Sequence, residues 1–312
     1  MMSKLIFFLL LIIFTLPSFA SKNPEMKCEM NDGVFRVIRN NHVLQKKYFS
    51  DEEQSLITCN NKIAVAIMGN YFVISDGFSI KDEYIGIRQD ESRLQLSVGE
   101  DVAGAIMGNY LVTVINGEIQ KEFISINSDE TRFKLALGSK MLVAIMGNYF
   151  IKVDENQIIK EYIPIFSKED RYDVVAGTNT CGAIMGNYFV ALINDEFIKE
   201  YAGISSQSDH FEIMAGNEVV AGIVDSYLLI ADKNSFTKEY VGQYETFSMD
   251  MKDKVIAASV GPYFIVFDRS VRGLQKKYIG RTGEIIFNDE QKITLKTLSG
   301  SYQYDLIEHR FL

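Results

Sequence analysis

The side chains of this sequence that could do chemistry recur at a fixed interval of 39 residues. One series is Arg93, Arg132 and Arg171, with His210 next in step, and a parallel series is Asn70, Asn109, Asn148 and Asn187. An arginine guanidinium is a planar fork of N–H donors, so a partial ring of Arg and Asn could recognise a polar or anionic partner. The competing interpretation is that Asn suits a tight turn and that each Arg neutralises preceding acids such as Asp90 and Glu91. The sequence alone leaves both interpretations open.

The sequence carries no motif for catalysis or for metal binding. A Ser-His-Asp arrangement, a Gly-rich phosphate loop, an HExxH motif and a CxxC pair are all missing, and only three His are present. We therefore expect a protein that is not an enzyme and that uses no metal and no cofactor. The alternative is a hydrolase or lyase whose unique site lies in the irregular units, around Asp225, Ser226 and Asp268.

The hexapeptide AIMGNY dominates the organisation of the chain. Intact copies occupy Ala66–Tyr71, Ala105–Tyr110, Ala144–Tyr149 and Ala183–Tyr188. Degraded copies follow at Ala221–Tyr227 and Ser259–Tyr263, and Gly300–Tyr302 is a last, shortened copy. Self-similarity with a period near 40 residues is typical of propellers and solenoids.

Four short strands fit into each period. In the unit that begins at Arg93, the apolar patterns predict strands at Leu94–Val98, Val102–Met107, Tyr110–Ile115 and Ile119–Ile124. Gly108-Asn109 predicts a tight hairpin between the second and third strands. Fourth strands mix charge with aromatics, as in Lys199-Glu200-Tyr201, and we interpret these Lys-Glu pairs as protection of an outer sheet edge rather than as a binding motif.

Four antiparallel strands in every 40 residues predict an all-β fold, a β-propeller of four-stranded blades. A β-solenoid is the alternative, but two-residue hairpins cannot join its parallel strands. The architecture resembles the broad propeller group that includes WD40-like and quinoprotein-like repeats. Because the chain has no Trp, it lacks the Trp-Asp dipeptide of the first and the repeated Trp of the second. The resemblance therefore implies a fold, without a specific family and without a quinone cofactor.

Marker residues predict seven blades. Seven aromatic residues, from Tyr48 to Tyr278, end the fourth strands, and seven first strands can be counted. The chain ends after a third strand at Tyr302–Ile307, and the early fourth strand Val43–Tyr48 lacks a first strand, so one blade would combine both termini. A hairpin at residues 27–37 does not fit this scheme. The alternative is an eight-bladed ring whose last blade is incomplete.

The N-terminus predicts export. Lys4, the apolar run Leu5–Leu16 and the small residues Ser18 and Ala20 form a signal peptide over residues 1–20, followed by a single propeller domain over residues 21–312. No later segment is apolar enough to span a bilayer, so we expect no stable membrane insertion after cleavage. The mature part has no Asn-x-Ser/Thr site, which favours a bacterial source and a periplasmic or secreted location.

Charge and cysteine content limit the partners. Lys4 is the one charge removed with residues 1–20, so the mature chain carries a net charge of −10. An acidic chain without a basic cluster argues against nucleic acid. Cys28 and Cys59 are the candidate pair for one disulfide, and Cys181 and the repeated Met68, Met107, Met146 and Met185 are interpreted as core residues.

Taken together, these patterns predict an exported scaffold that binds a protein or peptide through one face of the propeller. The alternative is a propeller that binds a glycan or another small ligand at several similar sites between blades.

Overall fold

The computed structural model describes residues 25–48, 55–87, 93–127, 130–165, 171–203, 211–242, 246–271, 273–288 and 291–312. The expected signal peptide lies outside these ranges. The regular structure within them is entirely β-strand, and no helix there is long and apolar enough to cross a membrane.

The strands form eight antiparallel sheets, which we number 1 to 8 in chain order. Sheet 1 contains β1 (Met26–Asn31), β2 (Val34–Arg39) and β3 (His42–Lys47). Sheets 2 to 4 contain β4 (Ser55–Cys59), β5 (Ala64–Met68), β6 (Tyr71–Ser75), β7 (Ile80–Tyr84); β8 (Leu94–Val98), β9 (Val102–Met107), β10 (Tyr110–Ile115), β11 (Glu118–Phe123); and β12 (Phe133–Leu137), β13 (Leu142–Met146), β14 (Tyr149–Val153), β15 (Ile158–Tyr162). Sheets 5 and 6 contain β16 (Tyr172–Ala176), β17 (Thr180–Met185), β18 (Tyr188–Ile193), β19 (Glu196–Tyr201); and β20 (Phe211–Ala215), β21 (Val219–Val224), β22 (Tyr227–Asp232), β23 (Ser235–Tyr240). Sheets 7 and 8 contain β24 (Phe247–Lys252), β25 (Val255–Val260), β26 (Tyr263–Asp268), β27 (Gly273–Tyr278); and β28 (Glu284–Asn288), β29 (Lys292–Thr297), β30 (Gly300–Asp305), β31 (Arg310–Phe311).

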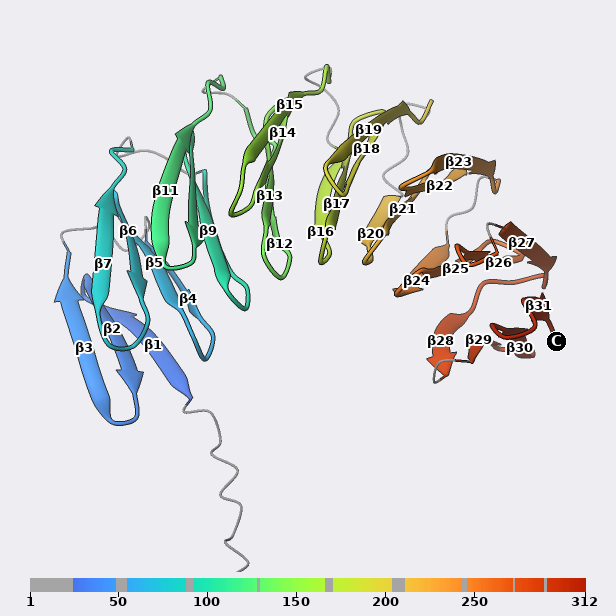
Figure 1. The fold of residues 1–312 in the computed structure, drawn as a ribbon, viewed down its shortest axis with the longest axis horizontal. Helices are drawn as coiled ribbons and strands as arrows, with labels where there is room; N and C mark the ends of the chain where they lie inside the picture. The colour runs from blue at the N-terminus through green and yellow to red at the C-terminus, as the bar shows by residue number, and fades with distance from the viewer. Residues whose placement is uncertain are drawn as a thin grey trace, which may run out of the picture.

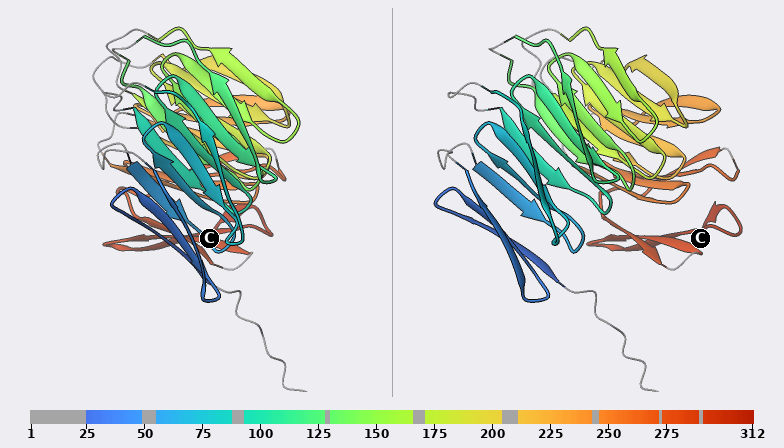
Figure 2. Two further views of the ribbon diagram at one scale, coloured as in Figure 1. Left: turned by 90° about the vertical axis from the view of Figure 1, so that its left-hand side faces the viewer. Right: turned by 60° about the vertical axis from the view of Figure 1, so that its left-hand side comes forward.

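The sheets follow one another around an arc in a propeller-like arrangement (Figure 1). First strands of neighbouring sheets contact one another, as β8 contacts β12, so these strands lie at the inner edge. The fourth strands lie at the outer edge. Sheets 1 and 8 occupy the two ends of the arc, with an opening between them (Figures 1 and 2).

The predicted count of seven blades is wrong, because the structure has eight sheets. The two termini do not share a sheet: β3 pairs with β2, and β28 to β31 form a sheet of their own. The eight-bladed alternative had the right number of sheets, but it expected the last sheet to be incomplete. Instead sheet 1 has three strands and sheet 8 has four. The missed fourth strand, β31, is only two residues long.

Local turns explain why the terminal strands pair with their sequence neighbours. Asp32 and Gly33 both adopt positive φ, as do Asn40 and Asn41, which is the geometry of tight hairpins that match the twist of the strands. In sheet 8 the Asp305 carboxylate accepts hydrogen bonds from the backbone N–H groups of Ile307 and Glu308, at 2.8 and 2.9 Å. This turn returns the chain to pair as β31.

Among the described residues the core consists of seven apolar clusters, one at each interface between neighbouring sheets. Second strands such as β5 and β9 are buried at every residue, because each interior sheet has a neighbour on both faces. The four repeated methionines Met68, Met107, Met146 and Met185 are fully buried in these interfaces, as is Cys181. They are packing residues.

The end sheets have polar outer faces. In sheet 1 the exposed Lys27, Glu29 and Arg36 alternate with residues that pack on sheet 2, and Arg36 donates to Glu29 at 2.6 Å. In β29 of sheet 8, Lys292 and Lys296 alternate with the buried Ile293 and Leu295. Terminal units of repeat proteins need such faces because they have one neighbour only.

A disulfide links the end of the arc to its interior. Cys28 of β1 is bonded to Cys59 of β4, with a Cα–Cα distance of 6.2 Å and a sequence separation of 31. The bond therefore joins sheet 1 covalently to sheet 2.

Candidate binding face

The antiparallel order of each sheet defines two faces of the arc. The Gly-Asn face carries the turns between second and third strands, from Gly69-Asn70 to Gly261-Pro262, together with the C-terminal ends of the fourth strands. The opposite face carries the loops between first and second strands and the turns between third and fourth strands. Every Arg and Asn of the two sequence series that the structure describes belongs to the Gly-Asn face; His210 lies outside the described residues.

The Gly-Asn turns hold the neighbouring strand ends together. In sheet 3, Gly108 has a φ of 60°, which glycine adopts without strain, and its N–H donates to the carbonyl of Arg93 at 2.9 Å. The carbonyl of Asn109 accepts from the N–H of Ile124 at 2.8 Å. The same pair of bonds recurs in sheets 4 and 5, so the backbone of each Arg is fixed on this face.

The side chains of Asn109 and Asn148 bind the end of the fourth strand and the chain that follows it. Asn109 Nδ2 donates to the carbonyl of Ile126 at 3.3 Å. Asn148 Nδ2 donates to the hydroxyl of Tyr162 at 3.1 Å and to the carbonyl of Ile165 at 3.4 Å. Asn70 is half-buried at the equivalent turn of sheet 2. These bonds give Asn109 and Asn148 a definite role in ordering the face.

The arginines do not form a uniform exposed ring. Arg132 is buried and donates two hydrogen bonds to the carboxylate of Glu130, from Nε to Oε1 at 2.7 Å and from Nη2 to Oε2 at 2.6 Å. Burial alone would raise the pKa of Glu130, but the hydrogen bonds and charge of Arg132 lower that pKa below its usual value. Arg171 is also buried and donates to Asn187 Oδ1 at 3.0 Å. Arg93 donates to the carbonyl of Asn127 at 3.3 Å.

A cavity of about 330 Å³ lies on the Gly-Asn face over sheet 4. Its walls include Arg132, Glu130, Asn148 and Tyr162, so it unites members of both sequence series with an aromatic ring. The charges in it compensate one another, which makes the cavity polar but not strongly charged.

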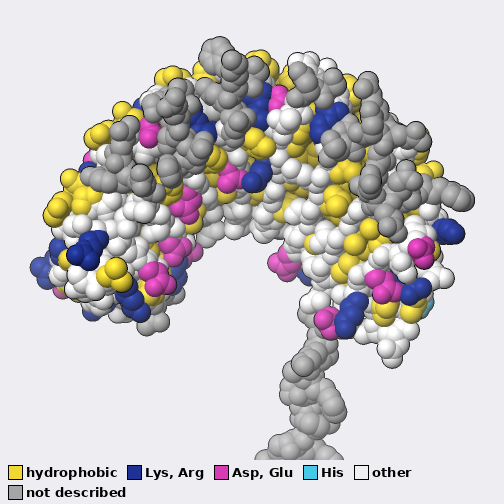
Figure 3. All heavy atoms as spheres, turned by 180° about the vertical axis from the view of Figure 1, so that it is seen from behind, with side chains coloured by type: hydrophobic (Ala, Val, Ile, Leu, Met, Phe, Trp, Pro, Cys, Tyr) yellow, Lys and Arg dark blue, Asp and Glu magenta, His cyan; other side chains and the backbone are white. Residues whose placement is uncertain are grey.

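A series of exposed aromatic residues lies beside these turns. The last residue of each fourth strand in sheets 2 to 7 is aromatic, and between 54 % and 70 % of each of these residues is exposed. We call the set the aromatic row; its members are Tyr84, Phe123, Tyr162, Tyr201, Tyr240 and Tyr278. Hydrophobic side chains recur along the outer margin of the arc in Figure 3.

Each ring of the aromatic row is held in place from beneath. It packs edge-on against the Tyr that begins the third strand, with ring centroids 5.3 to 5.7 Å apart in all six sheets. In several sheets a lysine from the next sheet also binds the backbone carbonyl of the aromatic residue. Lys121 Nζ donates to the carbonyl of Tyr84 at 3.1 Å, and Lys276 Nζ to that of Tyr240 at 3.3 Å.

The Lys and Glu residues of the fourth strands join neighbouring sheets. Lys121 lies 2.6 Å from Glu83, and Lys160 lies 3.1 Å from Glu122. The pairs therefore bridge the outer edges of successive sheets, besides placing charge on those edges. In these pairs each positive charge is balanced by a negative one, so they add no net charge to the surface between the aromatic rings.

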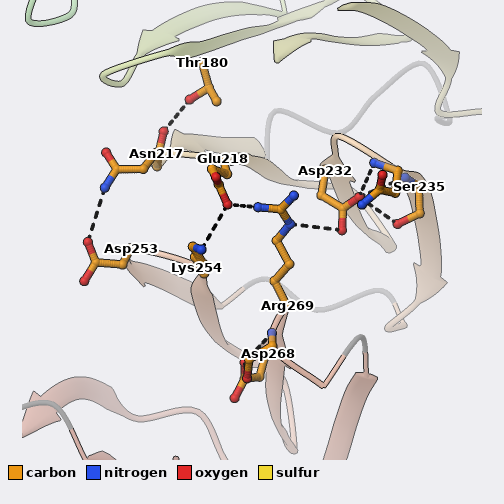
Figure 4. A network of polar contacts seen from close by, with 12 residues as sticks. Thr180, Asn217, Glu218, Asp232, Ser235, Asp253, Lys254, Asp268 and Arg269 are labelled. Atoms are coloured by element: carbon orange, nitrogen blue, oxygen red, sulfur yellow. Dashed lines mark hydrogen bonds and ion pairs between the residues drawn. The ribbon is translucent and has the colours of Figure 1, made fainter. Parts of the chain in front are cut away.

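The opposite face carries a polar network between sheets 6 and 7 (Figure 4). Glu218 binds both Lys254, at 3.2 Å, and Arg269, whose Nε also lies 3.7 Å from Asp232. The two positive and two negative groups neutralise one another, so the network holds the loops of sheets 6 and 7 together. Adjoining cavities of about 380 and 500 Å³ both border Lys254 and Ser270.

The residues of the irregular units do not converge on one site. Asp225 and Ser226 form a turn on the Gly-Asn face, whereas Asp268 ends β26 on the opposite face. Asp268 accepts a hydrogen bond from Ser270 N at 2.9 Å and lies 2.8 Å from Nδ1 of His309. Within the described ranges, no three His, Cys, Asp or Glu residues gather where they could hold a metal ion.

Comparison with known proteins gives similarity of fold at a low level. No protein-family model and no curated protein sequence matches the chain. PorZ, a surface component of the type-IX secretion system of Porphyromonas gingivalis, is 9 % identical with a TM-score of 0.30, over 91 % of this chain and 46 % of PorZ. AztD from Citrobacter koseri is 11 % identical with a TM-score of 0.32, over 83 % of this chain and 96 % of AztD.

A eukaryotic initiation factor is 10 % identical with a TM-score of 0.37, over 93 % of this chain and 95 % of the factor. Likenesses of this size carry no argument about function. The function has to be argued from the surface of the molecule itself.

Proposed function

We propose that this chain is an exported, non-catalytic binding protein that holds a protein partner against its Gly-Asn face. The observation that carries the proposal is the aromatic row. Aromatic residues are enriched in protein interfaces, because a ring offers a large apolar area and Tyr adds a hydrogen-bonding group. Single exposed apolar residues are ordinary, but one at the same position in six successive sheets is a patterned surface.

The supporting contacts make this surface suitable for binding. The ring beneath fixes each aromatic side chain before a partner arrives, and lysines hold the backbone of several members of the row, so little conformational entropy is lost on binding. The buried Arg132 and Arg171 are engaged within the face, which leaves apolar contact as its main attraction.

Export is proposed from the N-terminal sequence and fits the cysteine chemistry. A bond between Cys28 and Cys59 persists in an oxidising compartment, such as the periplasm or the extracellular space, and is rare in the cytosol.

The test compares two variants that each lose three exposed apolar side chains. The first, Tyr201→Ser/Tyr240→Ser/Tyr278→Ser, removes half of the aromatic row. The matched control, Phe78→Ser/Val271→Ser/Ile307→Ser, changes the opposite face at residues that are 66 %, 42 % and 65 % exposed. Each protein carries a photo-cross-linker at Tyr84 and is expressed in the native host.

We expect the wild type and the control to cross-link to the same protein and the first variant to lose at least 90 % of this product. Equal cross-linking by all three proteins, with unfolding midpoints unchanged, would contradict the proposal.

A further inference from the structure

The aromatic row spans sheets 2 to 7 and contributes one ring per sheet. A compact ligand would contact one or two of these rings. A ligand that uses the whole row has to be long, and it has to offer an apolar group at regular intervals.

The spacing of the sheets narrows the choice of conformation. Sheets that pack face to face are about 10 Å apart, and these sheets spread toward their outer edges, so successive rings are separated by that distance or somewhat more. A polyproline II segment advances about 3.1 Å per residue and repeats its direction every three residues, or about 9 Å. It can therefore present the same side to successive rings with three residues per sheet. An α-helix covers the same distance in about seven residues, or two turns, and also returns to the same side, so the choice between the two conformations rests on their hydrogen bonding.

The groups on the row fit a polyproline II segment chemically. Polyproline II has no internal hydrogen bonds, so its carbonyls need donors, and aromatic-lined surfaces bind its proline rings. Five of the six rings carry a phenol group. The oxygen of Tyr162 accepts from Asn148 at 3.1 Å, which leaves its O–H to donate outward. The paired charges between the rings, such as Lys160 with Glu122, offer no excess charge to a charged polymer.

We infer that the aromatic row binds an extended, proline-rich segment of the partner in the polyproline II conformation, running from sheet to sheet along the outer edge. This inference rests on the proposed function and specifies the part of the partner that is bound.

The experiment titrates the mature protein with synthetic repeats of Pro-Pro-Leu. Because the chain has no Trp, its Tyr emission reports directly on rings of this kind. The probes are peptides of about six and about 18 residues, the longer spanning about 56 Å at 3.1 Å per residue. A Gly-Ser peptide of the longer length and a neutral glucose hexasaccharide serve as comparison ligands.

We expect the longer Pro-Pro-Leu peptide to bind at least tenfold more tightly than the shorter one, because more rings are engaged at once. Tyr201→Ser/Tyr240→Ser/Tyr278→Ser should weaken that binding at least tenfold, and Phe78→Ser/Val271→Ser/Ile307→Ser should leave it unchanged.

Two results would overturn the inference. One is binding of the Pro-Pro-Leu peptides no tighter than that of the Gly-Ser peptide, and the other is binding of the hexasaccharide in their place. If cross-linking to the protein partner through Tyr84 persists in either case, the proposed function stands and only the nature of the bound segment is wrong. If cross-linking fails as well, the proposed function falls with it.

Discussion

Removing the disulfide should loosen one end of the arc and leave the rest intact. Sheet 1 has a single neighbour, and its buried contribution to the shared cluster is limited to Met26, Phe35, Val37 and Tyr48. The bond between Cys28 and Cys59 closes a loop with a sequence separation of 31. Chain-entropy estimates give about 4 kcal/mol for a loop of that length. That is comparable to burying two large apolar side chains, at about 1.5–3 kcal/mol each.

The assay is hydrogen exchange of Cys28→Ser/Cys59→Ser against the wild type, followed by mass spectrometry. A loss of about 4 kcal/mol corresponds to roughly a thousandfold faster exchange, at 1.4 kcal/mol for each factor of ten. We expect this acceleration in β1, β2 and β3 and almost none in sheets 3 to 7. As a control, Cys181→Ala should affect sheets 4 and 5, where that side chain is buried, and leave sheet 1 unchanged. Unchanged exchange in sheet 1, or a uniform change in all sheets, would refute the reasoning.

Three further predictions concern packing, pH and shape. Gly177→Ala places a Cβ against the carbonyl oxygen of Gly216 in the next sheet and should lower the free energy of unfolding in urea by about 1–3 kcal/mol. In the control Gly273→Ala the new Cβ has no neighbouring atom closer than 3.8 Å, so the free energy of unfolding should hardly change. The folded-state pKa of Glu130 lies below its ordinary value of 4.5, so the stabilisation that its carboxylate provides is complete above pH 4.5 and is lost as the pH falls through the lowered pKa. Between pH 6 and 3.5 the wild type should therefore lose more of its free energy of unfolding in urea than Glu130→Gln does. Equal losses by the two proteins would argue against this. Finally, the polar outer faces of sheets 1 and 8 favour an arc that stays open, and small-angle scattering should fit the open form better than a closed ring.

The strands were predictable because the repeat samples the same pattern several times. Leu94–Val98, Val102–Met107 and Tyr110–Ile115 were predicted with the bounds that the structure gives to β8, β9 and β10, and the fourth strand was displaced by one residue. The antiparallel order also followed from the two-residue turns, which parallel strands cannot use. Local chemistry alone determines all of these features.

The number of sheets was not predictable by the same means. A lone fourth strand such as β3 looks alike in sequence whether it pairs with β2 or with the far end of the chain. The deciding information lies in the tight turn at Asn40-Asn41, which makes local pairing geometrically easy. β31 was missed because two residues, Arg310 and Phe311, carry no periodicity.

The placement of the repeated residues on one face was predictable, but their accessibility was not. The 39-residue interval correctly indicates that Arg93, Arg132 and Arg171 directly precede equivalent strands on one face. It cannot reveal that Arg132 and Arg171 are buried while Tyr201 and Tyr240 are largely exposed, since exposure depends on side-chain packing across sheets. The aromatic residues were visible in the sequence, and only the structure distinguishes them from core residues.

The repeat constrains some positions and leaves others free, and this division explains where binding can evolve. The Ala-Ile-Met part of the AIMGNY segment is buried between sheets, so a change there disturbs two interfaces at once. The ends of the fourth strands face solvent and are anchored by their own sheet and the next one, so their side chains can vary at little cost in stability. The end sheets contribute the remaining constraint, because their polar faces stop further stacking after eight units. The length of the aromatic row, and with it the length of partner that the row can hold, therefore follows from how many interior sheets lie between those two ends.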